Sequence, residues 1–182
     1  MRLALMASTE AGDEKISQYI KEKGLKAAFM QIATQIKTDQ IFEELDLFDA
    51  EFVTPESDEW PEQLNDLAVP PIGLFVRGDV SILKSNSLAI VGTRNPTPYG
   101  IRVAQDFATG FVDRDWVITS GGAYGIDSAA HKGALVAEGR TIAVTASGLD
   151  TPYPAGNQRL FDEIAENGAI VSEYLPGVQA RP

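Results

Sequence analysis

Hydrophobic positions in the first fifty residues recur three and four residues apart. This spacing places apolar side chains on one face of an α-helix. Gly24 and Asp39 interrupt the pattern, which therefore predicts three short helices. Their apolar stripes are Ile16, Tyr19 and Ile20, then Leu25, Phe29, Ile32 and Ile36, then Ile41, Leu45 and Phe48. We interpret these stripes as the shared core of a small all-helical domain, residues 1–53, rather than as a ligand site.

The pattern changes at residue 54. Residues 54–79, TPESDEWPEQLNDLAVPPIGLFVRGD, combine prolines, a polar cluster and Trp60. Such a composition is typical of an ordered segment with little helix. We interpret residues 54–85 as a connecting segment that packs on a second domain, residues 86–182.

Short apolar runs alternate with helical periodicity in residues 86–182. The predicted strands are 88–92, 116–120, 141–147 and 169–174. The segments with helical spacing between them are 99–114, 125–139 and 157–168. This alternation predicts an α/β domain, a Rossmann-like parallel sheet with right-handed crossovers and flanking helices.

One predicted helix carries a stripe of small side chains. The stripe consists of Ile126, Ala129, Ala130, Gly133, Ala134 and Ala137. Side chains this small allow a helix to approach a sheet closely, so we expect residues 125–139 to press against the sheet.

Polar and glycine-rich segments follow the predicted strands. They hold Gly92, Thr93, Arg94, Tyr99 and Gly100, then Ser120, Gly121, Gly122, Ala123 and Gly125, then Gly148, Asp150, Tyr153 and Asn157, then Ser172 and Glu173. Ligands of open parallel sheets bind beyond the carboxyl ends of the strands. Glycines there can leave backbone N–H groups and a helix N-terminus open to an anion, although one such loop can equally be a simple tight turn. The convergence of four segments predicts a binding crevice.

The side chains in these segments favour a phosphate-bearing ligand. Arg94 can hold a phosphate through two hydrogen bonds, and Tyr99, Tyr124 and Tyr153 offer aromatic faces. Asn157 is placed to cap the helix that follows it. No G-x-G-x-x-G or G-K-[ST] motif is present, which argues against ordinary NAD or ATP binding. Single-stranded nucleic acid and a mononucleotide both fit these groups.

Asp127 and His131 lie four residues apart on one helix face. They could form an acid–base pair. The interpretation we favour is that Asp127 caps free N–H groups and His131 bonds a neighbouring loop, because no nucleophile or metal is in reach. With one histidine and no cysteine in the chain, no metal site and no cofactor are expected.

The composition of the chain excludes several classes of protein. The net charge is −11, and residues 1–85 carry 16 acidic against 8 basic side chains, so a generally basic DNA-coating protein is excluded. The absence of cysteine excludes disulfides and a cysteine nucleophile. No apolar run reaches membrane-spanning length and the start does not look like a secretory leader, so we expect a cytoplasmic protein without membrane contact.

Five ordered motifs resemble the DNA processing protein A family (DprA/Smf). They are GTR-x-PTPYG at 92–100, SGGAYGIDSAAHKGAL at 120–135, GRTIAV at 139–144, GLDTPYPAGN at 148–157 and SEYLPG at 172–177. LFVRGD at 74–79 also matches, so the resemblance covers about residues 54–177. It implies that Gly92, Thr93, Arg94, Ser120, Gly121, Gly122, Ala123 and Gly125 bind the ligand.

The resemblance also implies a fold and a biological role. The fold would be a Rossmann-like domain behind a small helical, SAM-like domain. The role would be that of a cytoplasmic bacterial protein that binds single-stranded DNA, protects incoming strands in natural transformation and helps load RecA-type recombinase. Homodimers and no catalytic turnover are implied. The family pattern continues beyond SEYLPG into an F-P-x-R-N-R-type segment, so the domain is expected to be incomplete at its C-terminus.

Two other functions remain open from the sequence. A similar sheet serves phosphoribohydrolases of nucleoside monophosphates, in which a carboxylate such as Glu173 would assist cleavage of the ribosyl bond. The chain lacks the P-G-G-x-G-T-x-x-E run of that class. The third possibility is a scaffold whose helical domain binds a protein partner.

Overall fold

The strands form a single mixed sheet. The computed structural model describes residues 1–180, and six strands lie side by side in the order β1-β2-β6-β5-β4-β3. Their bounds are β1 (Ala50–Val53), β2 (Leu74–Gly78), β3 (Ser87–Ala89), β4 (Val117–Gly121), β5 (Thr141–Thr145) and β6 (Ala169–Ser172). Strands β3 to β6 are mutually parallel, whereas β1 and β2 are antiparallel to their neighbours. The predicted α/β class and the parallel sheet are confirmed.

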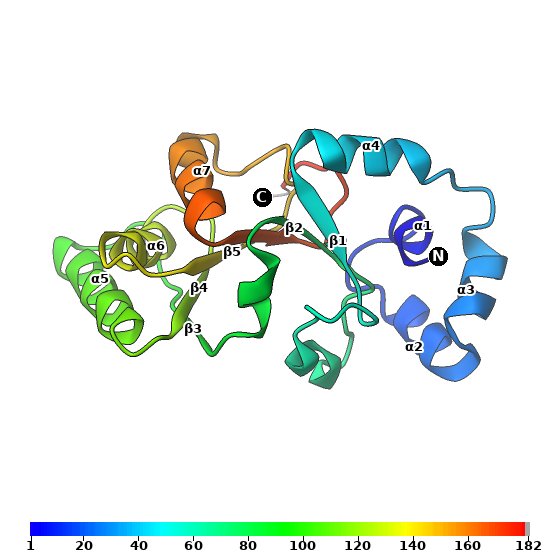
Figure 1. The fold of residues 1–182 in the computed structure, drawn as a ribbon, viewed down its shortest axis with the longest axis horizontal. Helices are drawn as coiled ribbons and strands as arrows, with labels where there is room; N and C mark the ends of the chain where they lie inside the picture. The colour runs from blue at the N-terminus through cyan, green and yellow to red at the C-terminus, as the bar shows by residue number, and fades with distance from the viewer. Residues whose placement is uncertain (181–182) are drawn as a thin grey trace.

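Three helices connect the parallel strands. They are α5 (Pro98–Val112), α6 (Ile126–Val136) and α7 (Gln158–Asn167). The parallel strands are neighbours in chain order, so right-handed crossovers place all three helices on one face of the sheet. Figure 1 shows them at the opposite end of the molecule from the N-terminal helices.

The N-terminal part is helical, as predicted. Its helices are α1 (Arg2–Met6), α2 (Glu14–Lys23), α3 (Leu25–Ile32) and α4 (Asp39–Leu47). The pattern missed α1, because five residues are too few to show a helical period. Asp13 caps α2 by accepting hydrogen bonds from the amides of Lys15 and Ile16. Leu5 and Ala28 are fully buried in the small core between α1 and α3.

Strands β1 and β2 are the main difference from the sequence expectation. Residues 50–53 lie in the part interpreted as helical, and residues 74–78 lie in the connecting segment, yet both join the sheet. Phe75 of β2 is fully buried on the α7 side beside Phe161, while Val76 packs with Trp60 on the other side. The connecting segment therefore contributes to the core of the sheet.

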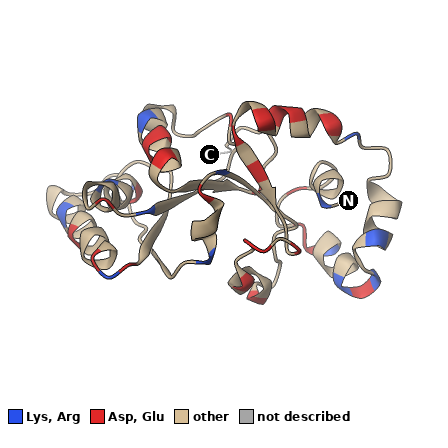
Figure 2. Cartoon of the chain, in the orientation of Figure 1, with Lys and Arg blue, Asp and Glu red and all other residues tan. Residues whose placement is uncertain are grey.

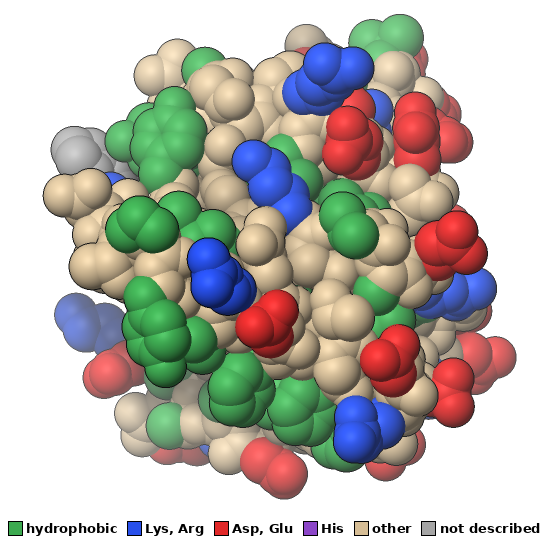
Figure 3. Space-filling view, turned by 90° about the vertical axis from the view of Figure 1, so that its left-hand side faces the viewer, with side chains coloured by type: hydrophobic (Ala, Val, Ile, Leu, Met, Phe, Trp, Pro, Cys, Tyr) green, Lys and Arg blue, Asp and Glu red, His purple; other side chains and the backbone are tan. Residues whose placement is uncertain are grey.

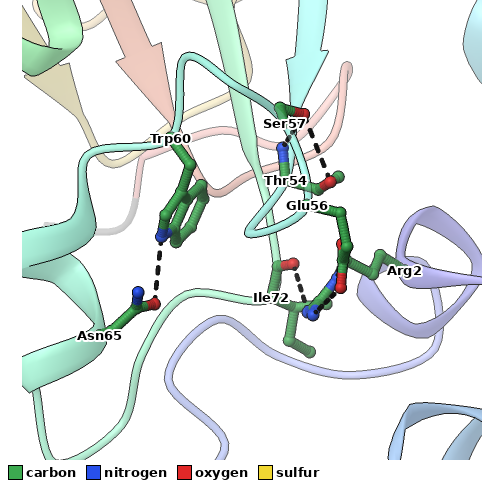
Figure 4. A network of polar contacts seen from close by, with 7 residues as sticks. All are labelled: Arg2, Thr54, Glu56, Ser57, Trp60, Asn65 and Ile72. Atoms are coloured by element: carbon green, nitrogen blue, oxygen red, sulfur yellow. Dashed lines mark hydrogen bonds and ion pairs between the residues drawn. The ribbon is translucent and has the colours of Figure 1, made fainter.

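A polar network fastens α1 to the connecting segment (Figure 4). The guanidinium of Arg2 donates to both carboxylate oxygens of Glu56, each at 2.7 Å, and to the carbonyl oxygen of Ile72 at 3.0 Å. The hydrogen bonds from Arg2 hold the pKa of Glu56 below its ordinary value. Nearby, Trp60 Nε1 donates to Asn65 Oδ1 at 3.1 Å, which fixes the buried indole.

The face of the sheet away from α5, α6 and α7 is only partly covered. A hollow of about 700 Å³ on this face is lined by Trp116, Ile142 and Val144, among others.

Acidic residues are concentrated on α4, whereas α5 carries both acidic and basic residues (Figure 2). None of the helices within residues 1–180 is long and apolar enough to cross a membrane.

Candidate nucleic-acid interface

A hollow of about 230 Å³ lies at the carboxyl ends of β4 and β5. We call it the Arg94 crevice. Its lining is Arg94, Gly121, Gly122, Ala123, Tyr124, Asp127, Val144, Thr145, Ala146, Tyr153, Pro154 and Ala180. Its location was predicted from the rule that ligands bind beyond the carboxyl ends of parallel strands. Residues 144–146 were not predicted to line it, although the same rule points to them because they lie at the end of β5.

Side chains from two helices hold the loop 120–125 from within. Asn157 Nδ2 donates to the carbonyl oxygen of Gly122 at 2.8 Å, and Ser128 Oγ donates to that of Ala123 at 2.7 Å. Asn157 is the N-cap residue of α7, as predicted, but its side chain makes no cap hydrogen bond to that helix. The loop is thus fixed in shape before any ligand arrives.

His131 provides another internal anchor for this loop. Its Nε2 lies 2.9 Å from the carbonyl oxygen of Gly121, which can only accept, so Nε2 carries the proton. Its Nδ1 lies 2.7 Å from Thr141 Oγ1, which is also 2.7 Å from the carbonyl oxygen of Ile118. Burial lowers the pKa of His131 to about 4. The imidazole is fully buried, and the interpretation that it bonds a neighbouring loop is confirmed.

Asp127 occupies the inner wall of the crevice. A Cβ atom on Gly121 would lie 2.6 Å from Asp127 Oδ2, so the carboxylate rests directly against that glycine. Burial raises the pKa of Asp127, and hydrogen bonding from the amides of Gly92 and Ala123 partly offsets the rise. The side chain thus caps loop amides, but it also puts a negative charge beside the expected phosphate site.

The backbone is less open to an anion than the glycine-rich sequence suggests. The amides of Gly92 and Ala123 face the carboxylate of Asp127. The amide of Ile126, the first residue of α6, donates to the carbonyl oxygen of Thr93 at 3.2 Å. These three N–H groups are used inside the protein and are not open to an anion, which makes the Arg94 side chain more important for attracting one.

Arg94 and two tyrosines are the exposed side chains of the crevice that can contact a ligand. Arg94 is exposed, and none of the ion pairs within residues 1–180 involves it. Its positive charge acts on Asp127 across the crevice. Tyr124 and Tyr153 are 50% and 49% exposed, so their rings are free for stacking. A guanidinium beside aromatic faces can hold a phosphate and flanking bases.

Two predicted glycines serve close approach between loops. Gly125 has a φ of 88°, a conformation that favours glycine. A Cβ atom on Gly92 would lie 2.8 Å from Ile126. The glycines let the loop after β3 pack against the start of α6. Two other residues predicted to bind the ligand, Tyr99 and Gly100, lie on α5 outside the crevice. Tyr99 is 76% exposed, and the amide of Gly100 donates to Thr97, the N-cap residue of α5.

Other predicted residues shape the strand ends without lining the crevice. The amide of Gly148 donates to Val178 O at 2.8 Å, and Asp150 accepts from the amide of Gly177 at 2.9 Å. Ser120 and Ser172 are buried and donate to backbone carbonyl oxygens. These contacts hold the segment after β6 beside the loops.

Glu173 faces different hollows. It lines spaces shared with Met6 and Thr9, between the N-terminal helices and the sheet, and it is absent from the lining of the Arg94 crevice. Burial raises the pKa of Glu173. Within residues 1–180, no group of three or more His, Asp and Glu side chains is placed to hold a metal ion.

Comparison with known proteins decides the family. The model of the family described as DNA recombination-mediator protein A matches residues 51–182. The chain belongs to this family. The resemblance seen in the sequence motifs is therefore confirmed.

Relatives of the family agree in sequence and in structure. DNA processing protein DprA of Bacillus subtilis is 40% identical over 121 residues, which cover 66% of this chain and 41% of the relative. The Streptococcus pneumoniae protein is 37% identical over 153 residues, 84% of this chain and 53% of the relative. Its crystal structure matches with a TM-score of 0.79 at 31% identity over 99% of this chain and 68% of that one.

A second solved relative is described for its DNA binding. The Helicobacter pylori DNA processing protein A, described for its single-stranded DNA binding mode, matches with a TM-score of 0.64 at 36% identity. The match covers 72% of this chain and 59% of that structure. The chain spans about half or less of the length of the curated DprA relatives that it matches, between 36% and 53%.

Proposed function

We propose that this chain binds single-stranded DNA through the Arg94 crevice. The observation that carries the proposal is a preformed hollow in which the guanidinium of Arg94, used by none of the ion pairs within residues 1–180, lies beside two half-exposed tyrosines. The guanidinium would hold a phosphate, and the rings of Tyr124 and Tyr153 would stack on bases. The single-stranded DNA binding described for the Helicobacter pylori relative supports the same ligand.

The wider role follows from the family. We propose that the protein acts in the cytoplasm as a recombination mediator without catalytic turnover. It would protect incoming single strands during natural transformation and help load a RecA-type recombinase onto them. The family description and the DNA-processing names of its relatives support this role.

The charge of the protein predicts modest, local binding. A net charge of −11 repels DNA over most of the surface, and the carboxylate of Asp127 lies inside the crevice. Few phosphates can therefore be neutralised at once. The dependence of affinity on salt should be shallow, because its slope counts the phosphates contacted.

Replacing Arg94 by alanine tests the site. We expect the affinity for a labelled oligo-dT, measured by fluorescence anisotropy, to fall roughly tenfold or more, because a hydrogen bond to a charged group contributes about 1.5–3 kcal/mol. The salt slope should also become shallower by roughly 0.7, the value for one lost phosphate contact on a single strand.

Arg140→Ala is the matched control. Arg140 immediately precedes β5, at the amino end of the parallel strands, and its exposed side chain pairs with Asp79 at 2.8 Å. The substitution removes the same charge away from the crevice and should leave affinity nearly unchanged. Equal affinities of wild type and Arg94→Ala, or equal losses in both variants, would contradict the proposed site.

A nucleotide-cleaving enzyme is the second candidate. The observation that favours it is the raised pKa of Asp127 inside the crevice, since perturbed carboxyls gather at catalytic sites. Glu173, the carboxylate expected from sequence to assist cleavage, lines other hollows. Incubation with AMP and chromatography for free adenine separates the two functions, and released adenine that disappears in Asp127→Asn would favour the enzyme.

A further inference from the structure

The carboxylate of Asp127 is the strongest hydrogen-bond acceptor in the lining of the Arg94 crevice. The carbonyl oxygens of residues 121–123, on the neighbouring loop, each accept a hydrogen bond from a buried side chain at 2.7–2.9 Å. They are therefore engaged inside the protein. Within residues 1–180, the charged side chains that line the crevice are Arg94 and Asp127. A ligand in the crevice thus meets one charged donor and one charged acceptor.

The amides around Asp127 do not exhaust its carboxylate. Hydrogen bonding from the amides of Gly92, Ala123 and Asp127 itself acts on the carboxyl group. An ionised carboxylate has about four acceptor positions, so at least one remains for a ligand. Asp127 is only 8% exposed, and this burial raises its pKa. A hydrogen bond from a ligand to a carboxylate that water solvates so poorly is stronger than the same bond in water.

The two charges decide how a nucleotide can lie in the crevice. Arg94 is exposed to solvent, whereas Asp127 lies on the inner wall against Gly121. A phosphate group is attracted to Arg94 and repelled by the carboxylate. The sugar-phosphate backbone therefore stays near Arg94, and the base points inward. The hollow of about 230 Å³ is smaller than the roughly 300–1,000 Å³ of typical ligand pockets, which suits a single base.

We propose that Asp127 makes the Arg94 crevice select a base with an exocyclic amino group, that is cytosine, adenine or guanine, over thymine. The amino group would donate to the remaining acceptor position, as the N4 amino group of cytosine does to aspartate and glutamate in protein–DNA complexes. Thymine has no amino group, and its O2 and O4 atoms would bring partial negative charge toward the carboxylate. This preference rests on the proposed binding of single-stranded DNA and adds the class of base that the crevice favours.

General charge offers little that could hide such a preference. Figure 3, which views the end of the molecule that carries α5, shows basic and acidic side chains scattered among hydrophobic ones rather than one basic surface. The net charge of the chain is −11. Contacts to phosphates are insensitive to sequence, whereas contacts to bases specify it. With few phosphates contacted, the contact to the base contributes a large share of the affinity.

Competition of unlabelled oligonucleotides against a labelled oligo-dT of the same length tests the preference. At slightly alkaline pH, where cytosine is unprotonated, oligo-dC should bind roughly tenfold or more tightly than oligo-dT, the effect of one hydrogen bond to a charged group. Oligo-dU, which also lacks the amino group, should bind no better than oligo-dT. Replacing cytosine by N4,N4-dimethylcytosine, which has no N–H donor, should cancel the advantage. An advantage that survives this replacement would overturn the proposal.

Asp127→Asn tests the same contact from the side of the protein. Asparagine keeps a carbonyl oxygen for the loop amides but carries no charge, so the variant should bind oligo-dT more tightly and lose most of its preference for oligo-dC. Asp106→Asn is the control, because it removes the same charge from an exposed position on α5, outside the crevice. A preference that Asp127→Asn keeps, or that Asp106→Asn loses, would contradict the role of Asp127. If circular dichroism shows that Asp127→Asn does not fold, the dimethylcytosine comparison with the wild-type chain decides.

Failure of the base preference and failure of the proposed DNA site give different results. If oligo-dC and oligo-dT bind equally and Arg94→Ala weakens both, the preference is wrong and the DNA site stands. If neither oligonucleotide binds, or if Arg94→Ala changes neither affinity, the proposed function is wrong and the preference falls with it.

Discussion

Single residues inside α6 determine the shape of the proposed DNA site. Asp127 and His131 are one helical turn apart, and both side chains point inward. The carboxylate of Asp127 rests against Gly121, and the imidazole of His131 bonds the carbonyl oxygen of the same glycine. Neither is positioned as an acid–base pair, because the imidazole is fully buried. Together they fix Gly121 and the loop after β4, so that the exposed Arg94 lies across the crevice from a rigid loop.

The buried state of His131 predicts a pH dependence of stability. Its pKa is about 4 in the folded protein and near 6.5 when unfolded, so the unfolded state binds more protons between these values. Stability therefore falls as the pH drops from 6.5 to 4, and His131 accounts for a loss of about 3 kcal/mol. Urea unfolding across this window measures it.

His131→Gln is the matched variant for this measurement. Glutamine keeps an N–H donor for Gly121 and cannot titrate, so the variant should lose less stability on acidification while the carboxylates of the chain titrate as before. The histidine is the only one in the chain, so its NMR titration is unambiguous. Equal pH profiles for both proteins, or an imidazole that titrates near pH 6.5, would contradict the account.

At the scale of elements, the small stripe of α6 brings two helices into close contact. Thr109 Oγ1 of α5 donates to the carbonyl oxygen of Gly133 at 3.3 Å. Ala108, Ala130 and Ala134 are fully buried in the core beneath. Close packing through small residues fixes the position of the N-terminal end of α6, and this end contacts the loops of the crevice.

Gly133→Ala should therefore weaken the fold. The added Cβ atom would lie 2.8 Å from the Cα and carbonyl oxygen of Gln105, and backbone cannot yield as a side chain can. We expect a loss of about 1–3 kcal/mol in the free energy of unfolding. Gly110→Ala is the control, because it adds the same group where a Cβ atom would meet only Arg114 Nη1, at 3.9 Å. Equal stabilities for the two variants would refute this account of the helix contact.

The elements also show what the sequence could and could not predict. The parallel strands and their helices have clear periods, so they were predicted to within a few residues. Strands β1 and β2 were missed because they lie among helical or proline-rich segments and take no part in the strand–helix alternation of the parallel strands. The glycine loops marked the crevice, but a pattern cannot show which way a side chain points, so the inward turn of Asp127 and the contacts of Asn157 came only from the structure.

At the scale of the whole molecule, a strongly acidic chain carries one small site suited to an anion. Acidic residues crowd α4 and the N-terminal part (Figure 2), while Arg94 lies at the far end of the sheet. This distribution favours a DNA strand that touches the strand ends and avoids the helical domain. Affinity then depends on a few contacts rather than on general charge.

The measurement that tests this account most directly is an NMR titration of the ¹⁵N-labelled chain with oligo-dT. The account predicts that amide shifts move first and most at Arg94 and at Gly121, Gly122 and Ala123, and that the amides of α2 and α3 stay unchanged. Shifts confined to the N-terminal helices or to α5, with the Arg94 crevice unaffected at saturation, would contradict it.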